Sequence, residues 1–376
     1  KRILSILLTL CMLFCLVPTS VFAEGETFKN VANAAELKSA LADDSVPGIR
    51  LTSNIVTGEA FSVTRTVTLD LNGYMLKMTG NDSVIRVEKK NQKIGDLTLI
   101  DSRPTTQHRF KADDKNGRWQ LDENGDMLVN GGIITSTGTE QRSGGGGVAV
   151  SADTKFTMTG GNIVGCDSDK LGSGVYVSFG TFTMTGGEIS GNTASRNGGG
   201  VAVVKGTFEM TDDAKISGNS AQMDYRHYEH KGGGVFVGAS GTFTMSGNAG
   251  VEGNLVRNGY SDSVAQGAGV YVSEGGTFTM SEKSSLKSNT MTSQYQSDAK
   301  NLNGGGVFVG GTLNLNGGTI EENIAYYEGG GLYVDTKGTV NLGTGTITVR
   351  NNTSEKTTGH NLYLPGEKKL IAPAGP

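Results

Sequence analysis

The residues best suited to contact a ligand lie in one polar and aromatic stretch of the chain. It reads Asp224-Tyr225-Arg226-His227-Tyr228-Glu229-His230 and holds two of the four histidines. A guanidinium group donates several hydrogen bonds in a fixed plane, and aromatic rings offer flat apolar faces with a polar handle. These groups suit a sugar or a protein surface, so Tyr225, Arg226, His227 and Tyr228 are candidate ligand-binding residues.

A second set of candidates is a series of aromatic residues at the centre of a recurring Val-x-Val segment. The central position is occupied by Tyr176, Phe236, Tyr271, Phe308, Tyr333 and Tyr363, and by alanine at Ala149 and Ala202. In a strand this position points away from the flanking valines. We expect an exterior aromatic stripe and add Phe236, Tyr271 and Phe308 to the candidate site. Alternatively, loops cover the stripe, or it only stabilises neighbouring strands.

Hydrolytic chemistry would need paired carboxylates for acid and base work. Two adjacent pairs occur in the repeats, Asp212-Asp213 and Glu321-Glu322, and each occupies a position that is also explained by a solvated turn. A nucleophile elbow, a phosphate-binding loop and a zinc-binding set are absent from the sequence. We therefore assign no catalytic residue, and the sequence favours binding over catalysis.

Metal binding has two weak candidates. His227 and His230 are three residues apart, but the spacing implies no third ligand. Asp122, Asn124 and Asp126 resemble a calcium loop with a misplaced glycine and with Ile133 at the position of the distal glutamate. A turn explains this segment better, and we assign no metal and no cofactor.

These candidates must be positioned by an internal repeat. Its first anchor is Gly-Gly-Val-x-Val, its second is Gly-Thr-Phe-Thr-Met, and its third is an aliphatic residue followed three positions later by Asn. Short apolar segments with period-two alternation predict strands. Three strands per unit, stacked on the next unit, predict an all-β, right-handed parallel β-helix with three strands per coil. Phenylalanines of the second anchor, such as Phe182 and Phe208, should form an inward ladder, with methionines forming the next.

The repeat also predicts the positions of asparagine and of the longest loops. We expect the asparagines at corners, in left-handed conformation and with stacked side-chain amides. Three consecutive units are longer than the others, because the chain inserts residues 221–231, 256–266 and 290–303 at one corner. Insertions on one side of a solenoid mark its working side. These insertions lead directly into Phe236, Tyr271 and Phe308.

The remaining chain divides into three parts. Residues 1–23 have a basic start, an apolar run and Ala23 at the cleavage position, which predicts a secretory signal peptide. Residues 24–143 form an N-terminal cap and irregular first coils, and residues 144–376 form the regular repeats. Asn33 to Glu36 predicts a capping box and a short N-terminal helix that covers the first coil. Residues 118–121 and 127–129 predict a hairpin.

Composition narrows the class of partner. The net charge of −4 becomes more negative once Lys1 and Arg2 leave, which argues against nucleic acid. Only Cys166 remains after signal-peptide removal, so no disulfide can form within one chain. No later apolar run is long enough to span a bilayer, so we expect no membrane insertion. We also expect the protein to be a monomer.

The repeat resembles those of two known groups of bacterial surface proteins. Gly-Gly-Val-x-Val with aliphatic-x-x-Asn, over residues 144–364, is similar to the repeats of chlamydial polymorphic outer-membrane proteins and of gut Firmicutes surface proteins. Both belong to the pectin-lyase-like β-helix superfamily. The resemblance implies a bacterial protein, secreted or at the cell surface, that acts in adhesion. The chain departs from it in lacking a C-terminal membrane barrel and a sortase motif.

The resulting hypothesis is a β-helix that binds a polysaccharide or a host or cell-surface glycoprotein. The alternative is a polysaccharide lyase or glycoside hydrolase of the pectin-lyase-like superfamily. A third interpretation, ice binding, rests on outward Thr-x-Thr pairs such as Thr242/Thr244 and Thr277/Thr279. Lys155 and Glu209 interrupt that array.

Overall fold

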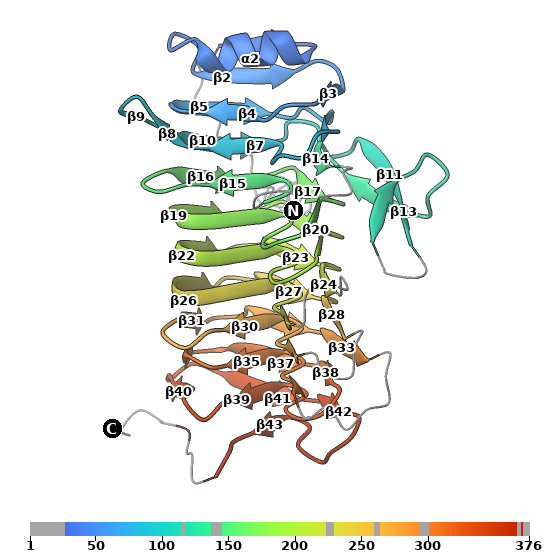
Figure 1. Cartoon of the computed structure of the whole chain (residues 1–376), viewed down its shortest axis with the longest axis vertical. Coiled ribbons are helices and arrows are strands. Elements are labelled where there is room, and N and C mark those ends of the chain that lie inside the picture. The colour runs from blue at the N-terminus through green and yellow to red at the C-terminus, as the bar shows by residue number, and fades with distance from the viewer. Residues whose placement is uncertain are drawn as a thin grey trace, which may run out of the picture.

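The computed structural model describes residues 27–113, 118–136, 145–222, 229–258, 264–293, 301–366 and 370. Within these residues the chain forms the predicted all-β parallel β-helix, whose coils stack along the long axis with the N-terminal coils at one end (Figure 1). The predicted signal peptide lies outside the described residues.

Three long parallel sheets form the faces of the coil. The front sheet contains β1 (Phe28–Val31), β2 (Gly48–Leu51), β4 (Phe61–Val63), β5 (Thr66–Asp70), β7 (Ile85–Val87), β10 (Asp96–Ile100), β15 (Val148–Val150), β16 (Lys155–Met158), β19 (Val175–Met184), β22 (Val201–Met210), β26 (Val235–Met245), β30 (Val270–Val272), β31 (Thr277–Met280), β35 (Val307–Val309), β36 (Thr312–Leu315), β39 (Leu332–Val334), β40 (Thr339–Leu342) and β43 (Leu362–Tyr363). The second sheet contains β3 (Ile55–Thr57), β6 (Met75–Met78), β14 (Ile133–Ser136), β17 (Asn162–Val164), β20 (Glu188–Ser190), β23 (Lys215–Ser217), β27 (Gly250–Glu252), β32 (Ser285–Lys287), β37 (Gly318–Glu321) and β41 (Ile347–Arg350). The third contains β18 (Asp167–Ser168), β21 (Thr193–Ala194), β24 (Ser220–Gln222), β28 (Leu255–Asn258), β33 (Thr290–Ser293), β38 (Ile324–Ala325) and β42 (Thr353–Ser354).

The repeat anchors are distributed over these sheets differently from the sequence-based expectation. The Val-x-Val and Phe-x-Met segments belong to one sheet, and in β19, β22 and β26 they join into a single strand. The third face is built instead by the two to four residues that follow each corner asparagine. These residues carry no shared apolar motif, so the repeat pattern could not mark them as a strand.

The core is a set of ladders in which each coil places the same side chain over the last. Consecutive rings of Phe156, Phe182, Phe208, Phe243 and Phe278 stack with centroids 4.6–4.9 Å apart and planes within 7° of parallel. All five phenylalanines and the neighbouring methionines of the same segments are fully buried. The predicted inward ladders are confirmed.

The corner asparagines form a buried amide ladder. In Asn192, Asn219, Asn254, Asn289 and Asn323, Nδ2 donates to Oδ1 of the corner asparagine in the next coil, at 2.9–3.0 Å. The backbone N–H of each donates to that same oxygen. Amide stacking was predicted correctly.

The expected left-handed conformation of these asparagines is wrong by one residue. The positive φ, between 53° and 59°, belongs to the residue before each asparagine, for example Gly191, Gly218 and Ser288. That residue makes the turn, and the asparagine can then point its amide inward. Cys166 replaces asparagine at the first such corner, where its backbone N–H donates to Asn192 Oδ1 at 2.9 Å.

The N-terminal end of the coil is covered by α2 (Ala34–Ala42), as predicted. Asn33 Oδ1 accepts from the N–H of Glu36 at 3.0 Å, and Glu36 Oε2 accepts from the N–H of Ala32 at 2.8 Å, which is a variant of the capping box in which Glu36 reaches the residue before the cap. Leu37 and Leu41 are buried against the first coils. The helix thus shields the apolar interior that no preceding coil could cover.

The prediction of a hairpin between residues 118–121 and 127–129 is wrong, because both segments pair with a third strand and not with each other. β12 (Trp119–Leu121) and β13 (Met127–Asn130) each pair antiparallel with β11 (Gln107–Ala112). They therefore run in the same direction and cannot form a hairpin with each other.

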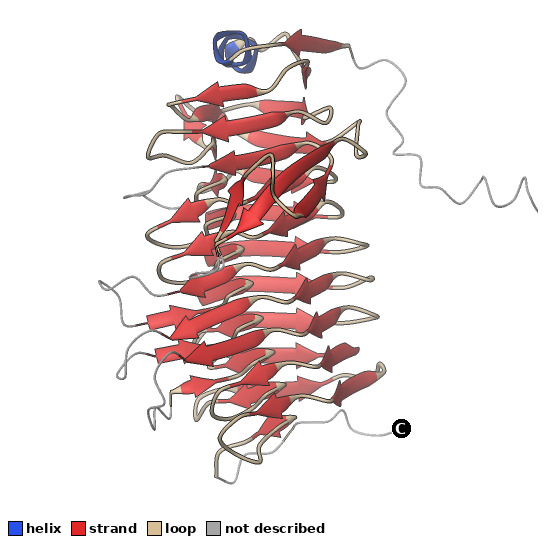
Figure 2. Cartoon of the chain, turned by 90° about the vertical axis from the view of Figure 1, so that its right-hand side faces the viewer, coloured by secondary structure: helices blue, strands red, loops and turns tan. Residues whose placement is uncertain are grey.

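This small sheet of β11, β12 and β13 projects from the side of the β-helix (Figures 1 and 2). Trp119 anchors it, since its ring lies directly against Gly191, where an added Cβ would be 2.1 Å from Cδ2. A short antiparallel pair, β8 (Lys89–Lys90) and β9 (Lys93–Ile94), extends another turn.

The amide ladder yields a test of stability. Asn254→Ala removes the acceptor of the buried Asn219 N–H and three further side-chain hydrogen bonds. An orphaned buried donor costs about 1–3 kcal/mol, and we expect a total loss of about 2–4 kcal/mol in the free energy of unfolding. Urea unfolding followed by circular dichroism measures it. Asn248→Ala, at an exposed turn preceding the same corner, is the control and should change stability by less than about 0.5 kcal/mol. Equal effects of the two substitutions would contradict a stabilising ladder.

Candidate functional surface

The outer face of the front sheet carries one continuous column of side chains. Strand register places each centre of Val-x-Val beside its equivalent in the next coil. The column reads Ser62, Arg86, Ala149, Tyr176, Ala202, Phe236, Tyr271, Phe308, Tyr333 and Tyr363. The predicted stripe therefore exists as an aligned row on one face.

Five consecutive rings of the column form an aromatic ladder, which we define as Phe236, Tyr271, Phe308, Tyr333 and Tyr363. Neighbouring centroids lie 4.9–5.5 Å apart, and the planes differ by 2–16°. Phe308, at the centre, is 3% exposed, whereas the other four are half-buried. The rings cover one another's faces, so the ladder offers ring edges and phenol hydroxyls to a partner.

Burial and nearby charge also perturb the phenols of the ladder. Burial, together with Tyr363, Asp335 and Glu328, raises the pKa of Tyr333 to about 12. Burial likewise raises the pKa of Tyr271, although the Lys231 ammonium opposes the rise. Lys231 Nζ lies 5.3 Å from the centroid of the Tyr271 ring and 2.8 Å from Glu229 Oε2. The ladder is therefore neutral and bordered by paired charges.

The three insertions gather on one flank, as expected. Their first residues extend the third sheet through β24, β28 and β33. Their last residues form a fourth parallel sheet of β25 (Glu229–Lys231), β29 (Val264–Gln266) and β34 (Leu302–Asn303). Between these sheets lies a separate apolar cluster that includes Val256, Met291, Leu302 and Tyr326. The insertions thus build a second, smaller core beside the aromatic ladder.

The candidate residues fall into two groups. Phe236, Tyr271 and Phe308 lie together in the aromatic ladder. Tyr225, Arg226, His227 and Tyr228 lie outside the described residues. His230, from the same stretch, is fully buried in β25, opposite Ala265 of β29.

The candidate carboxylate pairs have structural surroundings. Glu321 accepts a hydrogen bond from Arg350 Nε at 2.9 Å, and its carboxylate lies 3.3 Å from Lys287 Nζ. The hydrogen bond from Arg350 is the main cause of a lowered pKa of Glu321; Lys287 also lowers this pKa, whereas burial raises it. Asp212 has φ 53° in a turn, and Asp213 accepts from exposed Asn248 at 3.1 Å. Within the described ranges no group of three or more His, Cys, Asp or Glu side chains is arranged to hold a metal ion.

The outward threonines also align. One column continues through Thr181, Thr207, Thr242, Thr277, Thr312 and Thr339. The parallel column is broken by Glu209 and ends in Asn314 and Asn341. The threonine array is therefore regular in one of its two columns.

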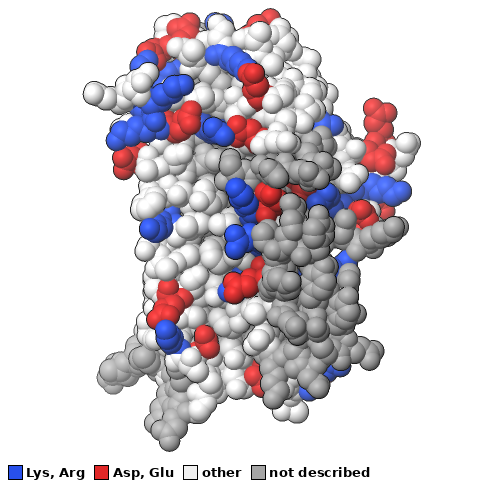
Figure 3. All heavy atoms as spheres, in the orientation of Figure 1, with Lys and Arg blue, Asp and Glu red and all other residues white. Residues whose placement is uncertain are grey.

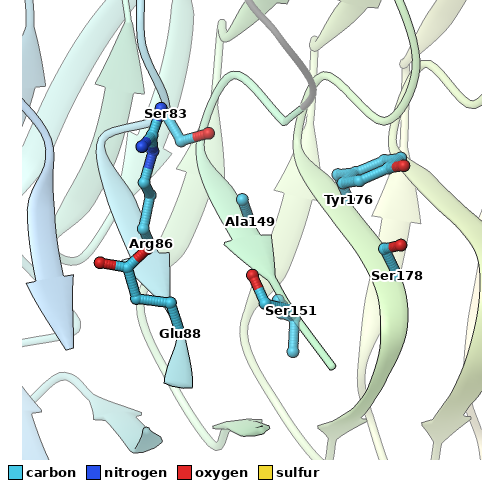
Figure 4. A pocket seen from close by; sticks show the side chains of 8 residues that line it. Ser83, Arg86, Glu88, Ala149, Ser151, Tyr176 and Ser178 are labelled. Atoms are coloured by element: carbon cyan, nitrogen blue, oxygen red, sulfur yellow. The ribbon is translucent and has the colours of Figure 1, made fainter. Parts of the chain in front are cut away.

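Sequence reasoning missed a hollow of about 160 Å³ at the N-terminal end of the outward column. It is lined by Ser83, Arg86, Glu88, Ala149, Val150, Ser151, Tyr176 and Ser178. Figure 4 shows Arg86 and Tyr176 on opposite sides of Ala149, with Glu88, Ser151 and Ser178 in the next row. The alanine leaves space that larger side chains fill in later coils. In the sequence, the small side chain of Ala149 at a position that is often aromatic was the feature that could have indicated this hollow.

On one face of the molecule, the described charges are mixed. On the face drawn in Figure 3, the described acidic and basic side chains are interspersed. Many form pairs, such as Lys89 with Asp153 and Lys337 with Glu274. Interspersed pairs of described charges create no broad electrostatic field of one sign over this part of the surface. These charges therefore attract a polyanion only weakly.

Comparison with known families agrees with this architecture. Residues 28–125 match the family described as "Putative pectate lyase-like adhesive domain". This match and the stacked parallel sheets fit a pectin-lyase-like β-helix repeat protein. No match was found for this β-helix protein among curated proteins or among solved structures. Within its described residues, no helix is both long and apolar enough to cross a membrane.

The raised pKa of Tyr333 gives a test of the aromatic ladder in this β-helix protein. Folding holds the phenol neutral, so its contribution to stability is complete below its usual pKa of 10 and is lost as the pH rises through about 12. We expect wild type to lose more thermal stability than Tyr333→Phe between about pH 9 and pH 11. Differential scanning fluorimetry measures both. Parallel pH profiles of the two proteins would show that Tyr333 titrates as in the unfolded chain.

Proposed function

We propose that this β-helix is an extracellular adhesive protein that binds polysaccharides or glycoproteins at a surface through its front sheet. The match of residues 28–125 to an adhesive domain carries this proposal. Secretion, predicted from residues 1–23, would bring the chain to such a partner, and we take it as part of the same proposal.

The aromatic ladder supports the contact surface. Its three inner rings, Tyr271, Phe308 and Tyr333, are held in place on both sides by stacking, so little side-chain entropy remains to be lost on binding. The hydroxyls of Tyr271, Tyr333 and Tyr363 alternate with ring edges along the axis of the β-helix. An extended glycan or a glycoprotein lying along that axis would meet a repeated apolar and hydrogen-bonding pattern.

The insertions support the same side. Sheet-forming segments at the base of each insertion place Glu229 and Lys231 beside Tyr271. Tyr225, Arg226, His227 and Tyr228 lie in the first insertion, directly before Glu229 in the chain, and we retain them as proposed contacts.

The proposal is tested by retention of the full chain on immobilised glycans and host glycoproteins, measured by surface plasmon resonance. We expect Tyr271→Ala with Tyr333→Ala to weaken retention at least about tenfold, because two rings in a contact surface contribute more than about 1.4 kcal/mol. The matched control is Phe179→Ala, which removes a 58% exposed ring outside the ladder. Thermal unfolding verifies that each variant is folded.

Three results would count against adhesion. In the first, wild type binds no surface, and in the second, the double variant and the Phe179→Ala control are retained equally. New reducing ends or unsaturated products, released with or without calcium, would instead identify a polysaccharide-degrading enzyme.

A further inference from the structure

Tyr176 differs from the rings of the aromatic ladder in its neighbours. Strand register places Ala149 on one side and Ala202 on the other. Among the described residues no ring stacks on Tyr176, whereas every ring of the ladder stacks on at least one other. A pyranose binds an aromatic side chain by packing its C–H groups on the ring face. Tyr176 is the ring of this column whose faces are not already covered by other rings.

The hollow beside Tyr176 has the size of one sugar residue. Its volume is about 160 Å³. At about 30 Å³ for each water in the liquid, that space corresponds to about five waters, which is enough for one sugar ring but not for two. Ala149 forms the floor, with Arg86 and Tyr176 on either side (Figure 4).

Polar groups around the hollow retain hydrogen-bonding capacity. The Arg86 guanidinium directs Nε and Nη2 to Asp82 Oδ1 at 2.8 and 2.7 Å, which fixes its plane and leaves further N–H groups unengaged by described residues. Glu88 Oε1 accepts from Ser62 at 2.5 Å, while Oε2 engages no described donor. The hydroxyls of Ser151 and Ser178 likewise make no hydrogen bond within the described structure. Donors and acceptors of both kinds suit sugar hydroxyls, each of which both donates and accepts.

The charge around the hollow selects among sugars. Asp82 already neutralises Arg86, and Glu88 adds a second carboxylate. Among the described lining residues, Glu88 would repel a uronate or sialate carboxylate placed here, and the cation Arg86 is already paired with Asp82. We infer that this hollow is a binding subsite for one neutral pyranose residue. The inference rests on the proposed function, since it supplies the sugar-recognition step of a glycan-contact surface.

The test uses the full chain and methyl glycosides of glucose, galactose, mannose and N-acetylglucosamine, followed by saturation-transfer difference NMR and titration calorimetry. We expect at least one to bind with a Kd of about 1 mM, and galacturonic acid to bind at least about tenfold more weakly. Ala149→Leu fills the hollow and should weaken binding at least about tenfold. Ala152→Leu, the same substitution at an exposed turn of the same coil, should leave it unchanged.

A second variant covers the case in which Ala149→Leu does not fold. Tyr176→Ala removes a half-buried surface ring and should also weaken binding at least about tenfold, whereas Phe28→Ala, which removes a half-buried ring at the N-terminal end of the same sheet, should not. Unaltered binding in Ala149→Leu or Tyr176→Ala would overturn the inference. If surfaces retain the chain but no methyl glycoside binds, the subsite is refuted and adhesion stands. If neither occurs, the proposed function fails and the subsite with it.

Discussion

Backbone pairing between successive coils is the constraint on which the rest of the structure depends. Parallel strands one coil apart lie about 4.8 Å from each other, so a side chain at any position meets its equivalent above and below. Inside, this spacing allows phenylalanine to stack on phenylalanine at 4.6–4.9 Å. Each coil then stabilises only its neighbours, and stability is a sum of nearest-neighbour contacts.

The same spacing solves the problem of polar groups at a buried corner. A lone buried amide would leave donors or acceptors unsatisfied, at considerable cost. A column of asparagines passes each Nδ2–H to the next Oδ1, and that oxygen also accepts a backbone N–H. Such a column needs special groups at its ends. At the N-terminal end of the column, Cys166 donates its backbone N–H to Asn192 Oδ1. At the other end, Asn361 Oδ1 accepts from Asn352 Nδ2.

How much of the structure could be predicted depends on whether residues repeat. The phenylalanine and asparagine ladders were predictable because identical residues recur once in each coil. The third sheet was not, because residues such as Asp167-Ser168 and Thr193-Ala194 share no pattern. The fourth sheet was missed for the same reason, since only position relative to the corner relates Glu229–Lys231 to Val264–Gln266. Of the candidate site, the aromatic alignment followed from spacing, but the hollow depends on β7 pairing with β15 across an irregular stretch.

Repetition also separates rings that build the surface from rings that can bind. Where an aromatic residue follows another in the column, as Phe308 follows Tyr271, stacking covers the ring faces and fixes the strands. Where alanine interrupts the column, the next ring keeps its faces, and the missing side chain leaves a hollow beside it. Ala149 and Ala202 make this interruption on both sides of Tyr176. In a structure that forces like residues together, a break in the repeat is therefore what creates room for a ligand.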